Sequence, residues 1–164
     1  MKNWKSNIAI ASIFIIFSAV LLVAFDDRVE MVKGFLFFML LSIASYTDIK
    51  TRTIPNIIHV LIMMVGLIQI DLVDSILGFL IVPLPFFIMA YVKEGSIGGG
   101  DVKLMAACGI NLGLITAYSS MILGLSIAII IHYLLVIQLV SSPDSSIPLA
   151  PYLSIGSILI LLLR

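Results

Sequence analysis

The sequence predicts an all-α, polytopic integral membrane protein: one helical bundle of about six to seven transmembrane segments, with a Gly-rich loop before a short helix. Hydrophobic residues make up 62% of the 164 positions and charged residues 11%, whereas soluble domains are about half apolar and a quarter charged. The apolar residues form long runs divided by short polar clusters. A chain of this size cannot bury so much apolar surface within itself. Lipid is therefore its expected solvent, and helices are the elements that satisfy their own backbone there.

The first three predicted segments are separated by charged or polar residues. The first covers residues 7–25; it is longer than a signal-peptide core and has no clear cleavage site, so we expect it to be retained. The cluster at 26–30 ends it, and the second segment covers 31–48. A polar loop at 49–54 precedes Pro55, which suits the first turn of a helix that ends near residue 70.

The second half of the chain contains the breaker residues. A fourth segment covers 74–91, with Pro83 and Pro85 expected to kink it. Residues 93–100 end in three glycines and predict a special loop, because glycine loses the most backbone freedom on ordering. We then expect a short helix at 101–111, a long helix at 114–140, a Ser/Pro loop at 141–150 and a last helix at 151–163. The whole chain, 1–164, is predicted to be a single transmembrane domain.

The basic residues predict how the chain lies in a cell membrane. If every segment crosses, most of them fall on one side, and most acids near 26–30 and 71–74 fall on the other. The basic side is normally cytoplasmic. The net charge is zero, so nucleic acid is not an expected partner. The basic residues on the predicted cytoplasmic side are Lys2, Lys5, Lys50, Arg52, Lys93 and Lys103.

Two aspartates stand out at the predicted cytoplasmic edge. Asp48 is expected at a helix C-terminus, where negative charge is disfavoured. Asp101 is expected to begin a helix, whose N-terminus favours the ionised carboxylate and predicts a lowered pKa. Alone, Asp48 can be read as a solvated loop acid, and Asp101 as an ordinary helix N-cap. Together they have the unequal environments that an acid/base pair needs to activate water against a peptide bond.

Other chemistries find little support in the sequence. His59 and His132 lie in separate apolar segments and are interpreted as packed or snorkelling side chains, and Cys108 as a small buried hydrophobe. No GxSxG or P-loop motif is present, which removes support for serine hydrolases and nucleotide enzymes. We expect no cofactor and no metal, because two carboxylates alone provide too few ligands for a metal ion.

Three blocks of the sequence resemble the type IV prepilin peptidases, a branch of the GxGD membrane aspartyl proteases. Asp48 is followed by Ile54, Pro55 and Asn56, similar to the family's aspartate–loop–Ile-Pro-Asn block. The second block contains Gly98, Gly100, Asp101 and Lys103, in the pattern GxGD-x-K-L. The third contains Pro148 and Pro151, similar to a Pro-Phe-Gly-Pro segment, with Leu149 and Ala150 replacing the Phe and Gly.

This resemblance implies an aspartic endopeptidase with Asp48 and Asp101 as its catalytic pair. Its substrates would be pilin-like precursors of prepilin, Tad or preflagellin type, whose leader is removed at the cytoplasmic face. Larger relatives also methylate the new N-terminus with a cysteine-containing domain; we expect no such activity here. Two other classes remain open: a transporter or channel that uses the broken helix around Gly98 and Asp101, and an inactive peptidase-like scaffold.

Overall fold

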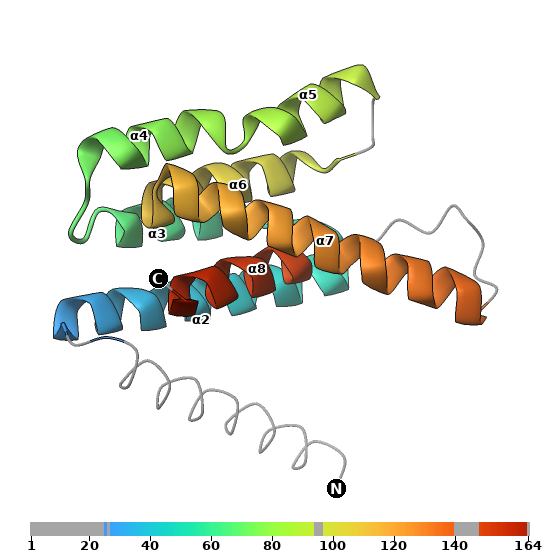
Figure 1. Cartoon of the computed structure of the whole chain (residues 1–164), viewed down its shortest axis with the longest axis horizontal. Coiled ribbons are helices and arrows are strands. Elements are labelled where there is room, and N and C mark those ends of the chain that lie inside the picture. Colours follow the sequence, from blue (N-terminus) through green and yellow to red (C-terminus); the bar gives the residue numbers. More distant parts are fainter. Residues whose placement is uncertain (1–24, 26, 94–96, 140–147, 164) are drawn as a thin grey trace, which may run out of the picture.

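The computed structural model describes residues 25, 27–93, 97–139 and 148–163 (Figure 1). The predicted first helix at 7–25 lies almost entirely outside these residues, as does most of the predicted Ser/Pro loop. Every regular element in the described part is an α-helix, which confirms the all-α prediction. The helices are α2 (Arg28–Thr51), α3 (Asn56–Gly66), α4 (Leu72–Ile81), α5 (Leu84–Val92), α6 (Gly99–Leu112), α7 (Leu114–Leu139) and α8 (Ala150–Leu163).

Three stretches of the described chain are long and apolar enough to cross a membrane. They are α2, the α4–α5 pair over Leu72–Val92, and the first part of α7 over Leu114–Leu134. The helices α3 and α8 are shorter but also apolar. Large apolar side chains such as Val73 and Ile115 face outward and are more than two-thirds exposed, at 71% and 77%. Such a surface suits lipid, and the prediction of a polytopic membrane bundle is confirmed.

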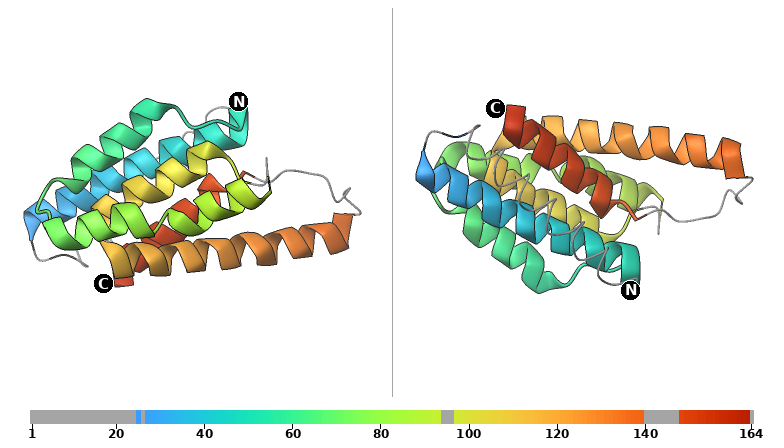
Figure 2. Two further views of the ribbon diagram at one scale, coloured as in Figure 1. Left: turned by 90° about the horizontal axis from the view of Figure 1, so that it is seen from above. Right: turned by 90° about the horizontal axis from the view of Figure 1, so that it is seen from below.

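Helix α6 forms the centre of the bundle (Figures 1 and 2). It packs against α3 and α4 most extensively, and also against α5, α7 and α8. Consecutive side chains from Leu104 to Cys108 are all buried, so this helix is enclosed on every face over that stretch. Helix α8 packs against both α2 and α7 and so links the two longest helices.

Glycine pairs allow the helices around α6 to cross at very short range. A Cβ on Gly109 of α6 would meet the backbone carbonyl of Gly78 in α4. A Cβ on Gly156 of α8 would likewise meet the backbone of Ser120 and Gly124 in α7. In membrane proteins small residues bring helices into direct backbone contact, which supplies the dispersion energy that hydrophobicity cannot supply in lipid.

Several predicted helix boundaries differ from the structure by a few residues, and α3 ends at Gly66 rather than near residue 70. Helix α2 does not stop at Asp48 but continues to Thr51, where Arg52 adopts a left-handed conformation (φ 55°) and donates its N–H to the Asp48 carbonyl. Helix α6 begins at Gly99 rather than Asp101, so glycine does not prevent a first helical turn here. The segment predicted to kink at Pro83 and Pro85 is interrupted there: α4 ends at Ile81 and α5 begins at Leu84.

Four helix ends meet at one end of the bundle. The C-terminal end of α2 and the N-terminal ends of α3, α6 and α8 lie there in all three views (Figures 1 and 2). Helices α2 and α6 reach it with opposite polarity, since one ends there and the other begins. This end therefore brings together the residues around Asp48, Asn56, Asp101 and Ala150, which are far apart in the chain.

Candidate active site

Asp48 lies in the last turn of α2 and is 7% exposed. Its Oδ2 accepts a hydrogen bond of 3.0 Å from the backbone N–H of Ala150, the first residue of α8. The first N–H groups of a helix have no partner within the helix and carry partial positive charge. The N-terminus of α8 therefore orients the side chain of Asp48.

Asp101 lies in the first turn of α6, a helix outside the three candidate membrane spans. Its burial, and secondarily the negative charge of Asp48, raises its pKa from 3.8 to about 7, while the backbone of Gly98 acts in the opposite direction. The sequence-based expectation of a lowered pKa is therefore wrong. The helix N-terminus does favour the anion, but desolvation and a second carboxylate outweigh that effect.

Both acids line one cavity of about 310 Å³ at this end of the bundle. The cavity wall comes from the end of α2, the loop that joins α2 to α3, and the first turns of α3 and α6. Most residues singled out from the sequence contribute to it, whereas Pro55, Pro148 and Pro151 do not. The lining residues are Asp48, Arg52, Thr53, Ile54, Asn56, Gly98, Gly99, Gly100, Asp101 and Lys103.

The three prolines instead shape the ends of the helices around the cavity. Pro55 is the N-cap residue of α3, one position before the helix begins, rather than a member of its first turn. Pro148 and Pro151 flank the segment that presents the Ala150 N–H. Ala150 itself is fully buried. The third sequence block therefore contacts Asp48 through a backbone N–H and not through a side chain.

Two polar contacts join α3 to the first turn of α6. The Lys103 ammonium donates a 3.0 Å hydrogen bond to Asn56 Oδ1. His59 Nε2 lies 3.0 Å from the carbonyl oxygen of Gly100. Asn56 and His59 are three residues apart and so share one face of α3, as Gly100 and Lys103 share one face of α6. In the sequence, Asp101 lies between Gly100 and Lys103, the two residues of α6 that make these contacts.

Residues 35–140 match the model of the type IV leader peptidase family. The chain belongs to this family. It is also 29% identical, over 143 residues, to the prepilin leader peptidase/N-methyltransferase of Bacillus subtilis (strain 168). That match covers 84% of the present chain and 58% of the relative, so the chain spans little more than half of the relative's length. No solved structure matches the chain significantly.

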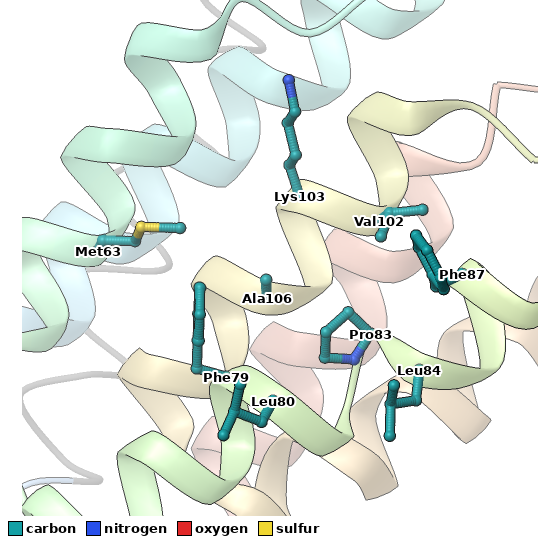
Figure 3. Close-up of a pocket in the computed structure, with 9 residues that line it drawn as sticks. All are labelled: Met63, Phe79, Leu80, Pro83, Leu84, Phe87, Val102, Lys103 and Ala106. Carbon is teal, nitrogen blue, oxygen red and sulfur yellow. The ribbon is translucent and has the colours of Figure 1, made fainter.

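This member of the leader peptidase family has a second, apolar groove beside the cavity (Figure 3). The groove has a volume of about 420 Å³ and lies between α3, the α4–α5 pair and α6. Lys103 borders both spaces, and its amine points away from the apolar side chains in Figure 3. Because the other lining side chains are apolar, the groove contains no acid or base besides Lys103. These apolar lining residues are Met63, Phe79, Leu80, Pro83, Leu84, Phe87, Val102 and Ala106.

One contact near the cavity of this leader peptidase family member, that of His59, cannot be foreseen from the chain's motifs. With no second histidine four residues away, the sequence predicts only a packed or snorkelling side chain for His59. It is packed, at 3% exposed, but it also contacts the glycine run before Asp101. Its spacing of three residues from Asn56 is a signal in the sequence that places the two on one helix face.

The described residues contain no group of three or more His, Cys, Asp or Glu side chains that could hold a metal ion. Cys108 is fully enclosed in α6, and burial raises its pKa to about 12. A thiol in such a place is a poor nucleophile, because the thiolate is the reactive form. Among the described residues that line the cavity, Asp48 and Asp101 are the two that carry carboxyl groups.

Proposed function

We propose that this protein is a membrane aspartyl endopeptidase that removes the leader peptide of pilin-like precursors at the cytoplasmic face of the cell membrane. The observation that carries the proposal is that Asp48 and Asp101, on different helices, line the same cavity. Membership of the type IV leader peptidase family supports the reaction class. Asp48 and Asp101 are proposed as the catalytic pair.

The two acids have different environments, which supports a division of labour. Asp101, with a pKa raised to about 7, is mostly protonated below neutral pH, while the Ala150 N–H holds Asp48 Oδ2 by a hydrogen bond. In the proposed reaction Asp48 takes a proton from a water molecule, whose oxygen attacks the scissile carbonyl carbon. Asp101 gives its proton to the carbonyl oxygen. As the tetrahedral diol collapses, the C–N bond breaks, Asp48 gives the proton it took from water to the leaving amine, and a hydroxyl proton of the diol returns to Asp101.

One unsatisfied atom supports a water or substrate position beside Asp101. Its Oδ1 is buried and has no hydrogen-bond partner among the described residues. A buried polar oxygen without a partner is costly, and such groups usually have a bound water or a catalytic role. Because Asp101 lines the cavity, a water or a peptide carbonyl in that cavity would satisfy this oxygen.

The two ends of the bundle differ in charge, which predicts its orientation in the membrane. Lys50 lies in the last turn of α2, Arg52 is the C-cap residue of α2, and Lys93 is the C-cap residue of α5. Acids at the first turns of α2 and α4 lie at the opposite end. Short basic loops favour the cytoplasmic side. The cavity is therefore proposed to open to the cytoplasm.

The substrate is proposed to be a prepilin, a Tad-type pilin or a preflagellin-type precursor. Each has a short leader before an apolar segment, and a cavity at the edge of a lipid-facing bundle suits a peptide bond at that junction. The relative from Bacillus subtilis carries both peptidase and N-methyltransferase in its name. For this chain we propose the peptidase step alone, since its one cysteine is enclosed in α6.

The proposal is tested by co-expressing the full chain with pilin-like precursors and measuring leader loss by mass spectrometry. We expect Asp48→Asn and Asp101→Asn each to abolish cleavage while the protein still inserts in the membrane. Glu30→Gln, an exposed acid at the opposite end of α2, is the matched control and should cleave normally. Cleavage by a folded double Asn variant, or ion flux in liposomes without any cleavage, would overturn the proposal.

A further inference from the structure

The glycine run before Asp101 is held by a residue from another helix. The Nε2 atom of His59 in α3 lies 3.0 Å from the carbonyl oxygen of Gly100, a residue 41 positions later in the sequence. The N-cap residue of α6, Gly98, has no side chain and makes no side-chain cap. Glycine also has the least intrinsic preference for helical geometry among residues other than proline. The first turn of α6 therefore depends on support from outside the helix.

The geometry determines the protonation state of the His59 ring. A carbonyl oxygen only accepts hydrogen bonds, so Nε2 must carry the proton in this contact. His59 Nδ1 is buried and has no partner among the described residues. A charged ring would place a second N–H at that nitrogen and leave it unsatisfied, which is costly in a buried position. The ring is therefore neutral, with its one proton on Nε2 directed at Gly100.

This hydrogen bond acts on the peptide unit that leads into Asp101. The Gly100 carbonyl and the Asp101 N–H belong to one planar peptide group. The Asp101 N–H in turn donates to the Gly98 carbonyl, at 3.0 Å. Fixing the Gly100 oxygen therefore fixes the plane from which the Asp101 side chain leaves the backbone. A small rotation of that plane would displace the carboxyl from the cavity it shares with Asp48.

We propose that His59 is a positioning residue of the peptidase: its neutral imidazole holds the Gly100 carbonyl through Nε2–H and so keeps the Asp101 carboxyl directed into the cavity. The inference rests on the proposed function, because it gives Asp101 a catalytic task. It adds a second member to the α3 face that already contains Asn56, whose side chain binds Lys103. Precise placement of a catalytic group affects turnover more than substrate binding.

The test compares two substitutions of similar length in the full-length protein. His59→Gln keeps an N–H donor at nearly the reach of Nε2, and His59→Met keeps the volume but has no donor. With a pilin-like precursor we expect His59→Met to lower kcat at least tenfold with KM within about threefold, and His59→Gln to recover most of kcat. We also expect the pH dependence of kcat to shift in His59→Met, because the distance and orientation of the Asp101 carboxyl relative to Asp48 would change.

A second readout does not depend on cleavage. Hydrogen–deuterium exchange of residues 99–102 should rise in His59→Met and stay near the parent in His59→Gln. Equal kcat and equal exchange in both variants would overturn the inference, and so would equal losses in both with matching losses of thermal stability, since His59 would then only fill the core. If Asp48→Asn and Asp101→Asn both cleave normally, the proposed function fails, and the exchange experiment still decides whether His59 orders the first turn of α6.

Discussion

The carboxylate of Asp48 accepts a hydrogen bond from the backbone of Ala150, a residue 102 positions later in the chain. The contact joins the end of α2 to the beginning of α8, and it gives a buried acid both a donor and the positive end of a helix dipole. The segment around Pro148 and Pro151 thus supports the candidate site without lining its cavity. Because the donor is a main-chain N–H, the hydrogen bond does not depend on the side chain of Ala150.

Replacing Ala150 by proline tests this contact, because proline removes the N–H and is otherwise tolerated at the first position of a helix. We expect cleavage by Ala150→Pro to fall at least about tenfold, which corresponds to ~1.4 kcal/mol of transition-state stabilisation. Ala150→Gly keeps the N–H and should retain most activity. Ala150 is fully buried, so the thermal stability of both variants must be measured. Unchanged cleavage by a folded Ala150→Pro protein would show that Asp48 does not need this donor.

The pH dependence of stability tests the environment of Asp101. Its folded-state pKa is raised to about 7 from 3.8, so the folded protein binds more protons than the unfolded chain between those values. Stability should therefore fall as pH rises from about 4 to 7 and then level off. Asp101→Asn cannot lose a proton and should be more stable than the parent at pH 7.5, with the difference shrinking toward pH 4. Thermal unfolding in detergent across this range is the measurement; a pH-independent difference would contradict the raised pKa.

Cleavage should also decline with rising pH if protonated Asp101 supplies the proton to the substrate carbonyl. The two carboxyl groups titrate as a pair, so kcat is expected to decrease above an apparent pKa near the value of about 7 found for Asp101. Initial rates of precursor cleavage from pH 5 to pH 9 measure this limb. Rates that stay level to pH 9 would place the essential proton elsewhere.

The neighbouring glycines Gly98 and Gly99 should respond differently to alanine. A Cβ on Gly98 would lie 3.2 Å from Asp101 Oδ2, whereas a Cβ on Gly99 would meet nothing within 4 Å. Gly98→Ala must displace the Asp101 carboxyl and should lower kcat about tenfold or more, since small displacements of catalytic groups reduce turnover strongly. Gly99→Ala should cleave within about twofold of the parent and gain slightly in stability, because alanine favours helix. Equal effects of the two substitutions would remove the special role of Gly98.

The contact between Lys103 and Asn56 is best tested by a double-mutant cycle. Lys103→Met and Asn56→Leu each remove one partner of the 3.0 Å hydrogen bond. We expect each to lower kcat/KM modestly, and the double variant to lose little more than either single one, with a coupling energy of about 0.5–1.5 kcal/mol. Additive losses would mean that the two side chains act independently, for instance on lipid or substrate.

The sequence by itself determined the helical class and most of the helix order. Apolar runs too long for a soluble core require lipid, and lipid permits few structures besides helices. The break at Pro83 followed from local chemistry in the same way, because proline removes a helical hydrogen bond. The blocks around Asp48 and Asp101 also identified the family, since they depend on residue identity and order alone.

The tertiary structure alone decided how the charges behave. Helix position predicted that Asp101 would ionise readily, but its burial and the neighbouring Asp48 raise its pKa instead, and neither effect can be read from local sequence. The contacts of Asp48 with Ala150 and of His59 with Gly100 join residues 102 and 41 positions apart. Such pairings arise only when helices pack. Within one helix the sequence predicts which residues lie side by side, three or four positions apart, but it does not predict which residues of another helix they contact.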